Sequence, residues 1–294
     1  MGFAITATNV LSQAILNGFT SGFATLGSQA YGAGNYVLVA RYCHRALFII
    51  LIVGLLELPL YFFLGPALAG IGVNAEVADL VGRYGLIVYP GFLANGGASL
   101  VGRFFLSQRV IWPQFLPAIL VLPLHFTLCY ILSDSLGFEG IALSMCITYI
   151  AKLAISLSFL LKCCKCLRSR ETIQPFSKAD FQGWGTYLKV AVPAMALSVI
   201  EWWSFELSTI VCSFTTVSIL AGQTVIMNYG QMLYLVSAGC ANALATLVGN
   251  AIGMGRPYLA KLFARDGILF ALSIASVLVL LSIIFRDWIL SFFT

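Results

Sequence analysis

Positions 24–34 read ATLGSQAYGAG, and positions 245–255 read ATLVGNAIGMG. The two stretches agree at six of eleven positions, at an offset of 221 residues, and each closes a long apolar segment and is followed by basic residues. Glycine gives the backbone the freedom to leave a helix. Gly32, Gly34, Gly253 and Gly255 are therefore predicted to form the turns on which these segments end. Two copies in the same context indicate an internal repeat, which organises the rest of the chain.

The composition is that of a membrane protein. Hydrophobic residues make up 60% of the chain and charged residues 9%, whereas a soluble domain carries about 25% charged residues. Apolar runs of membrane-spanning length recur along the whole sequence, which predicts an all-α, polytopic membrane protein. The net charge of +5 then reports on topology, and no nucleic-acid partner is expected. Because Met1 leads straight into apolar sequence, no signal peptide is expected either.

About eight transmembrane helices are expected. Their approximate ranges are 3–26, 47–69, 78–106, 113–132, 140–161, 189–214, 218–249 and 266–285, and the third is expected to break near Pro90. Of the 16 Lys and Arg residues, 13 fall in loops or helix ends on one side: Arg41, Arg45, Arg103, Arg109, Lys162, Lys165, Arg168, Arg170, Lys178, Lys189, Arg256, Lys261 and Arg265. The other side holds Arg83 and Arg286. This bias places the first side in the cytoplasm.

The repeat predicts how the helices are grouped. Six helix steps separate the copies, so both point the same way, as in a parallel repeat about an axis along the membrane normal. We expect an N-terminal lobe of five helices (1–162), a cytoplasmic linker (163–188) and a partial C-terminal lobe of three helices (189–294). Since the repeat unit is about six helices, the second lobe is expected to be incomplete and the chain alone to export little.

Two acidic residues lie inside the sixth expected helix, where the sequence reads EWWSFE at positions 201–206. Inserting an acidic residue at the centre of a membrane costs about 2.5–3.5 kcal/mol of free energy, so its presence there calls for an explanation. Glu201 lies near the middle of the bilayer and Glu206 further out, about 140° apart around the helix. A carboxylate at such a depth can exchange a proton for an organic cation, and indoles add cation–π attraction.

The predicted proton and cation site is therefore Glu201 and Glu206. The predicted substrate cavity consists of Trp202, Trp203, Phe205, Asn228 and Gln231. The simpler alternative is that the tryptophans pack against neighbouring helices, that the glutamates satisfy buried polar groups, and that the amides of the seventh helix bond between helices.

Three further polar residues lie in apolar helices. Glu57 either takes part in function or caps backbone freed by Pro59. Lys152 is expected to extend its amine to the lipid headgroups. His125 reads as a hydrogen-bonded packing residue, and a proton relay is the alternative.

Cysteines cluster once, at Cys163, Cys164 and Cys166, on the basic end of a helix. No second ligand cluster lies at metal spacing, so no metal site is expected. Lipidation next to the membrane is the alternative to an inert or merely reactive trio.

The chain resembles the multidrug and toxic compound extrusion (MATE) family, in its eukaryotic branch. The resemblance rests on 22–36, Arg83-Tyr84 with Pro90-Gly91, 104–108, 176–193, EWWSFE at 201–206 and VGNAIG at 248–253, in order and over nearly the whole chain. It implies proton-coupled export of organic cations by two six-helix lobes that alternate access, with Glu201 as a transport residue and Glu206 in support. The chain aligns with the second to ninth of the family's helices. Asn228 falls where some animal relatives carry a third acidic residue.

The sequence also allows other kinds of membrane protein, though not all equally well. One is a truncated, non-transporting membrane protein derived from a transporter. Another is a flippase of lipid-linked saccharides, which would be expected to line its cavity with several cations. An enzyme is not expected, because no paired intramembrane Asp residues and no nucleophile with a base stand out. No cofactor is expected, and the coupling ion is H⁺ or Na⁺. The substrate, the particular membrane and the oligomeric state are not specified by the sequence.

Overall fold

The computed structural model describes residues 2–70, 72–162, 170–213 and 217–291. These residues form helices joined by short turns, and the cysteine trio at 163, 164 and 166 lies outside them. The elements are α1 (Gly2–Thr8), a π-helical segment η1 (Asn9–Gln13), α2 (Ala14–Gly32), α3 (Tyr36–Gly70), α4 (Ala75–Ser107), α5 (Trp112–Lys162), η3 (Arg170–Thr172), η4 (Lys178–Phe181), α6 (Trp184–Ser213), α7 (Val217–Gly253), α8 (Pro257–Ile284) and α9 (Arg286–Ser291). α1, η1 and α2 form one continuous rod.

α5 is a hairpin of two antiparallel helices, because its backbone turns back at Gly137 (φ 58°, ψ −127°). Hydrogen bonds across the hairpin join His125 to Thr148 at 3.0 Å and Cys129 to Ser144 at 3.4 Å. Counting its two arms separately, the part of the chain that the structure describes forms eight helical rods of spanning length, the number predicted. Among the described residues, α3, α5, most of α6, much of α7, and α8 are long and apolar enough to cross a membrane.

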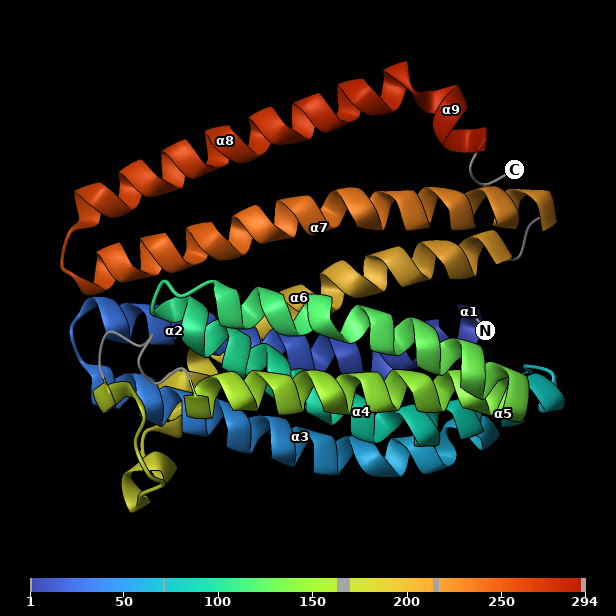
Figure 1. Cartoon of the computed structure of the whole chain (residues 1–294), viewed down its shortest axis with the longest axis horizontal. Coiled ribbons are helices and arrows are strands. Elements are labelled where there is room, and N and C mark those ends of the chain that lie inside the picture. The colour runs from blue at the N-terminus through green and yellow to red at the C-terminus, as the bar shows by residue number, and fades with distance from the viewer. Residues whose placement is uncertain (1, 71, 163–169, 214–216, 292–294) are drawn as a thin grey trace.

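The helix ends gather at two ends of the molecule (Figure 1). The α2–α3 turn, the α4–α5 turn, the linker and the α7–α8 turn lie together at what we call the basic end. The α3–α4 turn, the Gly137 turn and both chain termini lie at the opposite end. α2 and α7, which carry the two repeat copies, both run toward the basic end, as the parallel repeat predicts.

Some predicted boundaries are wrong for physical reasons. The second helix begins at Tyr36 instead of position 47, because Arg41 and Arg45 lie within the helix and the preceding turn needs only 33–35. The predicted break near Pro90 is also absent, since α4 continues through this proline. Gly91, the next residue, lies against the backbone of Cys146, and this packing against α5 holds the helix together where one backbone donor is missing.

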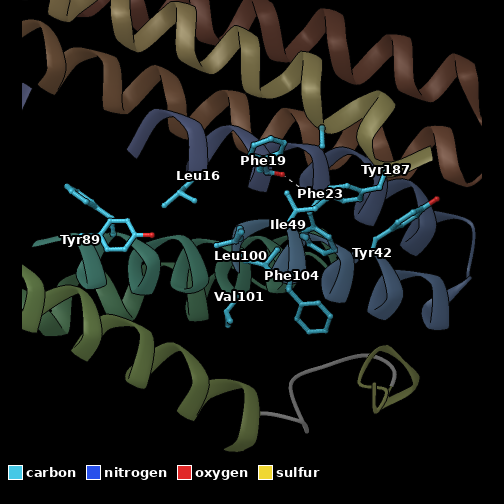
Figure 2. Packing of buried hydrophobic residues seen from close by; sticks show 14 of the residues in the cluster. Leu16, Phe19, Phe23, Tyr42, Ile49, Tyr89, Leu100, Val101, Phe104 and Tyr187 are labelled. Atoms are coloured by element: carbon cyan, nitrogen blue, oxygen red, sulfur yellow. Dashed lines mark hydrogen bonds between the residues drawn. The ribbon is translucent and has the colours of Figure 1, made fainter. Parts of the chain in front are cut away.

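The core of the N-terminal lobe lies between α2, α3 and α4 (Figure 2). Phe23, Ile50 and Phe105 are fully buried there. Tyr187 of α6 reaches into the same core and donates from its hydroxyl to the Phe19 carbonyl at 3.0 Å. Part of α6 is therefore fixed to α2, a helix of the other lobe.

The linker is docked on the basic end of α3. The buried Asp180 carboxylate lies 3.1 Å from Nδ1 of His44 and accepts a hydrogen bond from the Ser177 backbone at 2.7 Å. Arg45 donates to the Asp180 carbonyl at 3.3 Å, and Phe176 packs on the His44 ring at 4.4 Å. The segment between the two lobes is thus tied to the N-terminal lobe.

Candidate functional site

Glu206 joins the two lobes. Its carboxylate, on α6, accepts a hydrogen bond from the Thr6 hydroxyl at 2.7 Å and a longer one from the Asn9 amide at 3.5 Å. Thr6 belongs to α1 and Asn9 to η1, so both donors come from the N-terminal lobe. A carboxylate predicted to support proton binding therefore lies in the contact between the lobes.

Trp203 makes a second contact across the same boundary. Its indole Nε1 donates to the Val10 carbonyl at 3.1 Å, while 40% of its surface stays exposed. Val10 lies in η1, where the wider turn bonds the Ala14 amide to the Asn9 carbonyl. π-helical turns are often found at functional sites.

Glu201 points to a different side of α6. It is exposed, and the Tyr234 hydroxyl of α7 lies beside its carboxylate. The Phe205 ring packs edge-on against the same tyrosine, with ring centroids 6.0 Å apart. Glu201 and Phe205 thus meet at the α6–α7 boundary, whereas Glu206 faces α1. Trp202, next to Glu201, is partly buried.

The two α7 amides fall in different sectors. Met227 and Tyr234 both contact α6, through Ser208 and Phe205. Gln231 lies at helical spacing between them and shares that stripe. Asn228 lies about 60° from Gln231 around the helix and about 100° from Met227. Both amides are exposed, and the structure places Gln231 on the face that carries Tyr234, the neighbour of Glu201.

The two repeat copies make matching turns. Asn35 donates from its backbone to the Ala30 carbonyl, and Arg256 to the Ala251 carbonyl, each at 3.0 Å. Gly34 (φ 73°) and Gly255 (φ 69°) take the left-handed conformation that such helix ends require. The capping hydrogen bonds therefore repeat at the same 221-residue offset as the sequence.

The other two glycines bring the copies into contact. A Cβ on Gly32 would lie 2.1 Å from the Asn250 carbonyl oxygen, and one on Gly253 would lie 2.0 Å from that of Gln29. Asn250 also donates to the Ser107 carbonyl at the end of α4, at 3.2 Å. The backbones of the two lobes are therefore in direct contact at the basic end, at positions where only glycine leaves enough room.

Sequence reasoning did not find the partners of Glu57. This carboxylate is 4% exposed and accepts a hydrogen bond from the Ser12 hydroxyl at 2.6 Å, and Tyr61 donates to the same hydroxyl at 2.8 Å. Its other oxygen, Oε1, has no hydrogen-bond partner among the described residues, so no cap on the backbone freed by Pro59 is seen there. Ser12 follows no motif, and only the tertiary structure brings it to α3.

Two other polar residues are now placed. His125 is bonded to Thr148 within the α5 hairpin, in line with a packing role. The expectation that the Lys152 amine extends outward from its helix is wrong, because the amine points into the N-terminal lobe. It donates instead to Oδ1 of Asn95 on α4 at 2.9 Å. A polar acceptor inside the lobe draws the amine inward.

These features define an integral, multi-pass membrane protein with helices grouped in two lobes, whose contact contains the Glu206 carboxylate. A family model described as MatE matches residues 1–131 and 193–294. The chain belongs to the MatE family.

Relatives agree with this assignment. The chain is 27% identical over 286 residues to Protein DETOXIFICATION 16 of Arabidopsis thaliana, covering 95% of this chain and 58% of the relative. It is 28% identical over 298 residues to Multidrug and toxin extrusion protein 1 of Danio rerio, covering 100% of this chain and 50% of that protein. The chain thus spans about half the length of these relatives.

The crystal structure of the eukaryotic MATE transporter AtDTX14 has the same fold. Its TM-score to this chain is 0.83 at 22% identity, over 92% of this chain and 60% of that one. A crystal structure of MATE in complex with MaL6 superposes with a TM-score of 0.77 at 15% identity, over 99% of this chain and 66% of that one.

Proposed function

We propose that the chain forms part of an exporter that exchanges organic cations for protons by alternating access. The carrying observation is the hydrogen bonding of Glu206 to Thr6 and Asn9 of the other lobe. A carboxylate accepts from both donors, but a protonated carboxyl loses acceptor capacity and gains a donor. Taking up a proton at Glu206 therefore changes the contact between the lobes.

Glu201 is the proposed point of exchange. Its carboxylate is exposed, so a cation can reach it, and Tyr234 and Phe205 offer aromatic surface beside it. An organic cation and a proton compete for one carboxylate, which couples their movements. The contact between the repeat copies at the basic end is consistent with alternating access. The lobes are closed at that end, and they would have to separate for a cation to bind from that side.

Binding to the purified chain tests the exchange without requiring a complete transport pathway. Fluorescence of ethidium, a model organic cation, is titrated in detergent between pH 5.5 and 8.5. One competing proton weakens apparent affinity by about tenfold per pH unit on the acid side. Glu201→Gln keeps shape and hydrogen bonding but cannot ionise, so binding should weaken and lose its pH dependence.

The matched control is Glu76→Gln, which alters an exposed carboxylate at the start of α4. It should leave the affinity and its pH dependence unchanged. If Glu201→Gln binds ethidium with the original pH dependence, the exchange does not take place at Glu201 and the packing interpretation stands.

A further inference from the structure

A polar cavity of about 160 Å³ lies within the N-terminal lobe, away from the α6 carboxylates. It is bounded by α4 and both arms of α5, and its polar lining consists of Ser99, Arg103, Gln114, Lys152 and Ser156. Since water occupies about 30 Å³ per molecule in the liquid, the cavity has room for a few waters or one small polar group.

The described residues that line the cavity include two basic side chains, Arg103 and Lys152, and no acidic one. Among the residues that the structure describes, neither Arg103 nor Lys152 forms an ion pair. Lys152 uses one of its three N–H donors in the hydrogen bond to Asn95. Partly buried charges without partners are costly.

Neutral donors complete the cavity wall. Ser99 supplies a hydroxyl. The buried Oε1 of Gln114 has no hydrogen-bond donor among the described residues. Amide oxygen and nitrogen are assigned from their partners, and turning this amide would present its NH₂ group at that position. Two cations, a hydroxyl and an amide suit an oxyanion.

We propose that this cavity binds the oxyanion of a phosphate group. Arg103 lies one turn before the end of α4, and this helix ends at the basic end of the molecule (Figure 1), where the bias of basic residues places the headgroups of the cytoplasmic leaflet. The phosphate can therefore come from an anionic phospholipid or from a soluble phosphate. The site is distinct from the α6 site, and its occupant is of opposite charge to an organic cation.

Two experiments on the delipidated, purified chain show whether the phosphate belongs to a lipid headgroup or to a soluble anion. Native mass spectrometry compares phosphatidylglycerol with phosphatidylcholine, and the thermal midpoint of tryptophan fluorescence is followed during titration with inorganic phosphate. Selective retention of about one phosphatidylglycerol indicates a lipid headgroup, and a rise in midpoint with phosphate indicates a soluble anion. Failure of both ligands to bind overturns the proposal.

Variants locate the binding. Arg103→Gln and Lys152→Met should each weaken binding by about tenfold or more, since a hydrogen bond to a charged group is lost. Arg256→Gln, which removes an exposed cation at the same end, should have little effect at 150 mM salt because exposed charges are screened. Equal effects of all three would mean general attraction to a basic surface and would overturn the proposal.

The sign of the stability change separates anion binding from a structural role. Without anion, Lys152→Met removes an uncompensated charge and should raise the thermal midpoint; with saturating ligand the original chain should be the more stable. If Lys152 merely held Asn95, the variant would be less stable under both conditions, and that result would also contradict the proposal.

Discussion

Gly32→Ala should open the basic end of the molecule. The added Cβ would lie 2.1 Å from the Asn250 carbonyl oxygen, and real Cβ contacts essentially never fall below 3.0 Å. The two backbones must therefore separate by about 1 Å. Overpacking of this kind costs about 1–3 kcal/mol, and 1.4 kcal/mol is a factor of about ten. The better helix propensity of alanine acts in every conformation, so it does not change the ratio of closed to open states.

Spin labels at Asn35→Cys and Met254→Cys, in a chain without its eight native cysteines, measure this change by double electron–electron resonance. The closed population relative to the open one should fall by about 5- to 150-fold with Gly32→Ala, and the distances should become longer. Gly253→Ala, on the other copy, should act alike. An unchanged distance distribution in both variants would refute the idea that close glycine packing holds this end shut.

Gly34→Ala is the matched control. Gly34 has a left-handed backbone, and its Cβ would meet nothing within 4 Å. Alanine there should lower stability by about 1 kcal/mol through backbone strain without separating the labels. Two glycines only two residues apart should therefore differ in their effect on the distance between the labels, since only the Cβ at Gly32 meets the other repeat copy.

Three further results are expected. Asp180→Ala should speed tryptic cleavage after Lys178, because the linker loses its contact with His44 and its helix cap; Asp266→Ala, at an exposed ion pair, should not. Tyr187→Phe should lower stability by about 1 kcal/mol, the net worth of one buried hydrogen bond, as read from the thermal midpoint, whereas Tyr130→Phe, at an 82% exposed residue, should not. A cysteine at position 136 should be labelled from outside intact cells and one at position 182 protected; the reverse pattern would contradict the predicted orientation.

The number of helices and some of their ends could be predicted where the local sequence signal was strong. The glycine pairs of the repeat gave the places where α2 and α7 end, because a left-handed helix end depends on residues close in sequence. The apolar runs gave eight rods. The start of α3 was missed because Arg41 and Arg45 resemble a loop by charge, although long basic side chains at a helix end reach polar surroundings on their own.

Side-chain partners could not be predicted in the same way. Lys152 and Asn95 are 57 residues apart, and Thr6 and Glu206 are 200 apart. Such pairs depend on how helices rotate against each other, and the pattern of apolar residues on a helix buried on most sides hardly specifies that rotation. The importance of Glu206 was indicated by its position in an apolar helix, while its partners required the fold.

The π-helical segment Asn9–Gln13 sets the rotational phase of the first rod. Gly18 and Gly22 of α2 pack against α6, and an unbroken α-helix would continue that face through Leu11 and Ala7. The π turn accommodates one more residue, which advances the face by about 100°. The residues that meet α6 are consequently Val10, Asn9 and Thr6. Deleting one residue from 11–13 would restore a regular α-helix and leave Thr6 facing Glu206, whereas straightening the π turn at unchanged length would bring apolar side chains there.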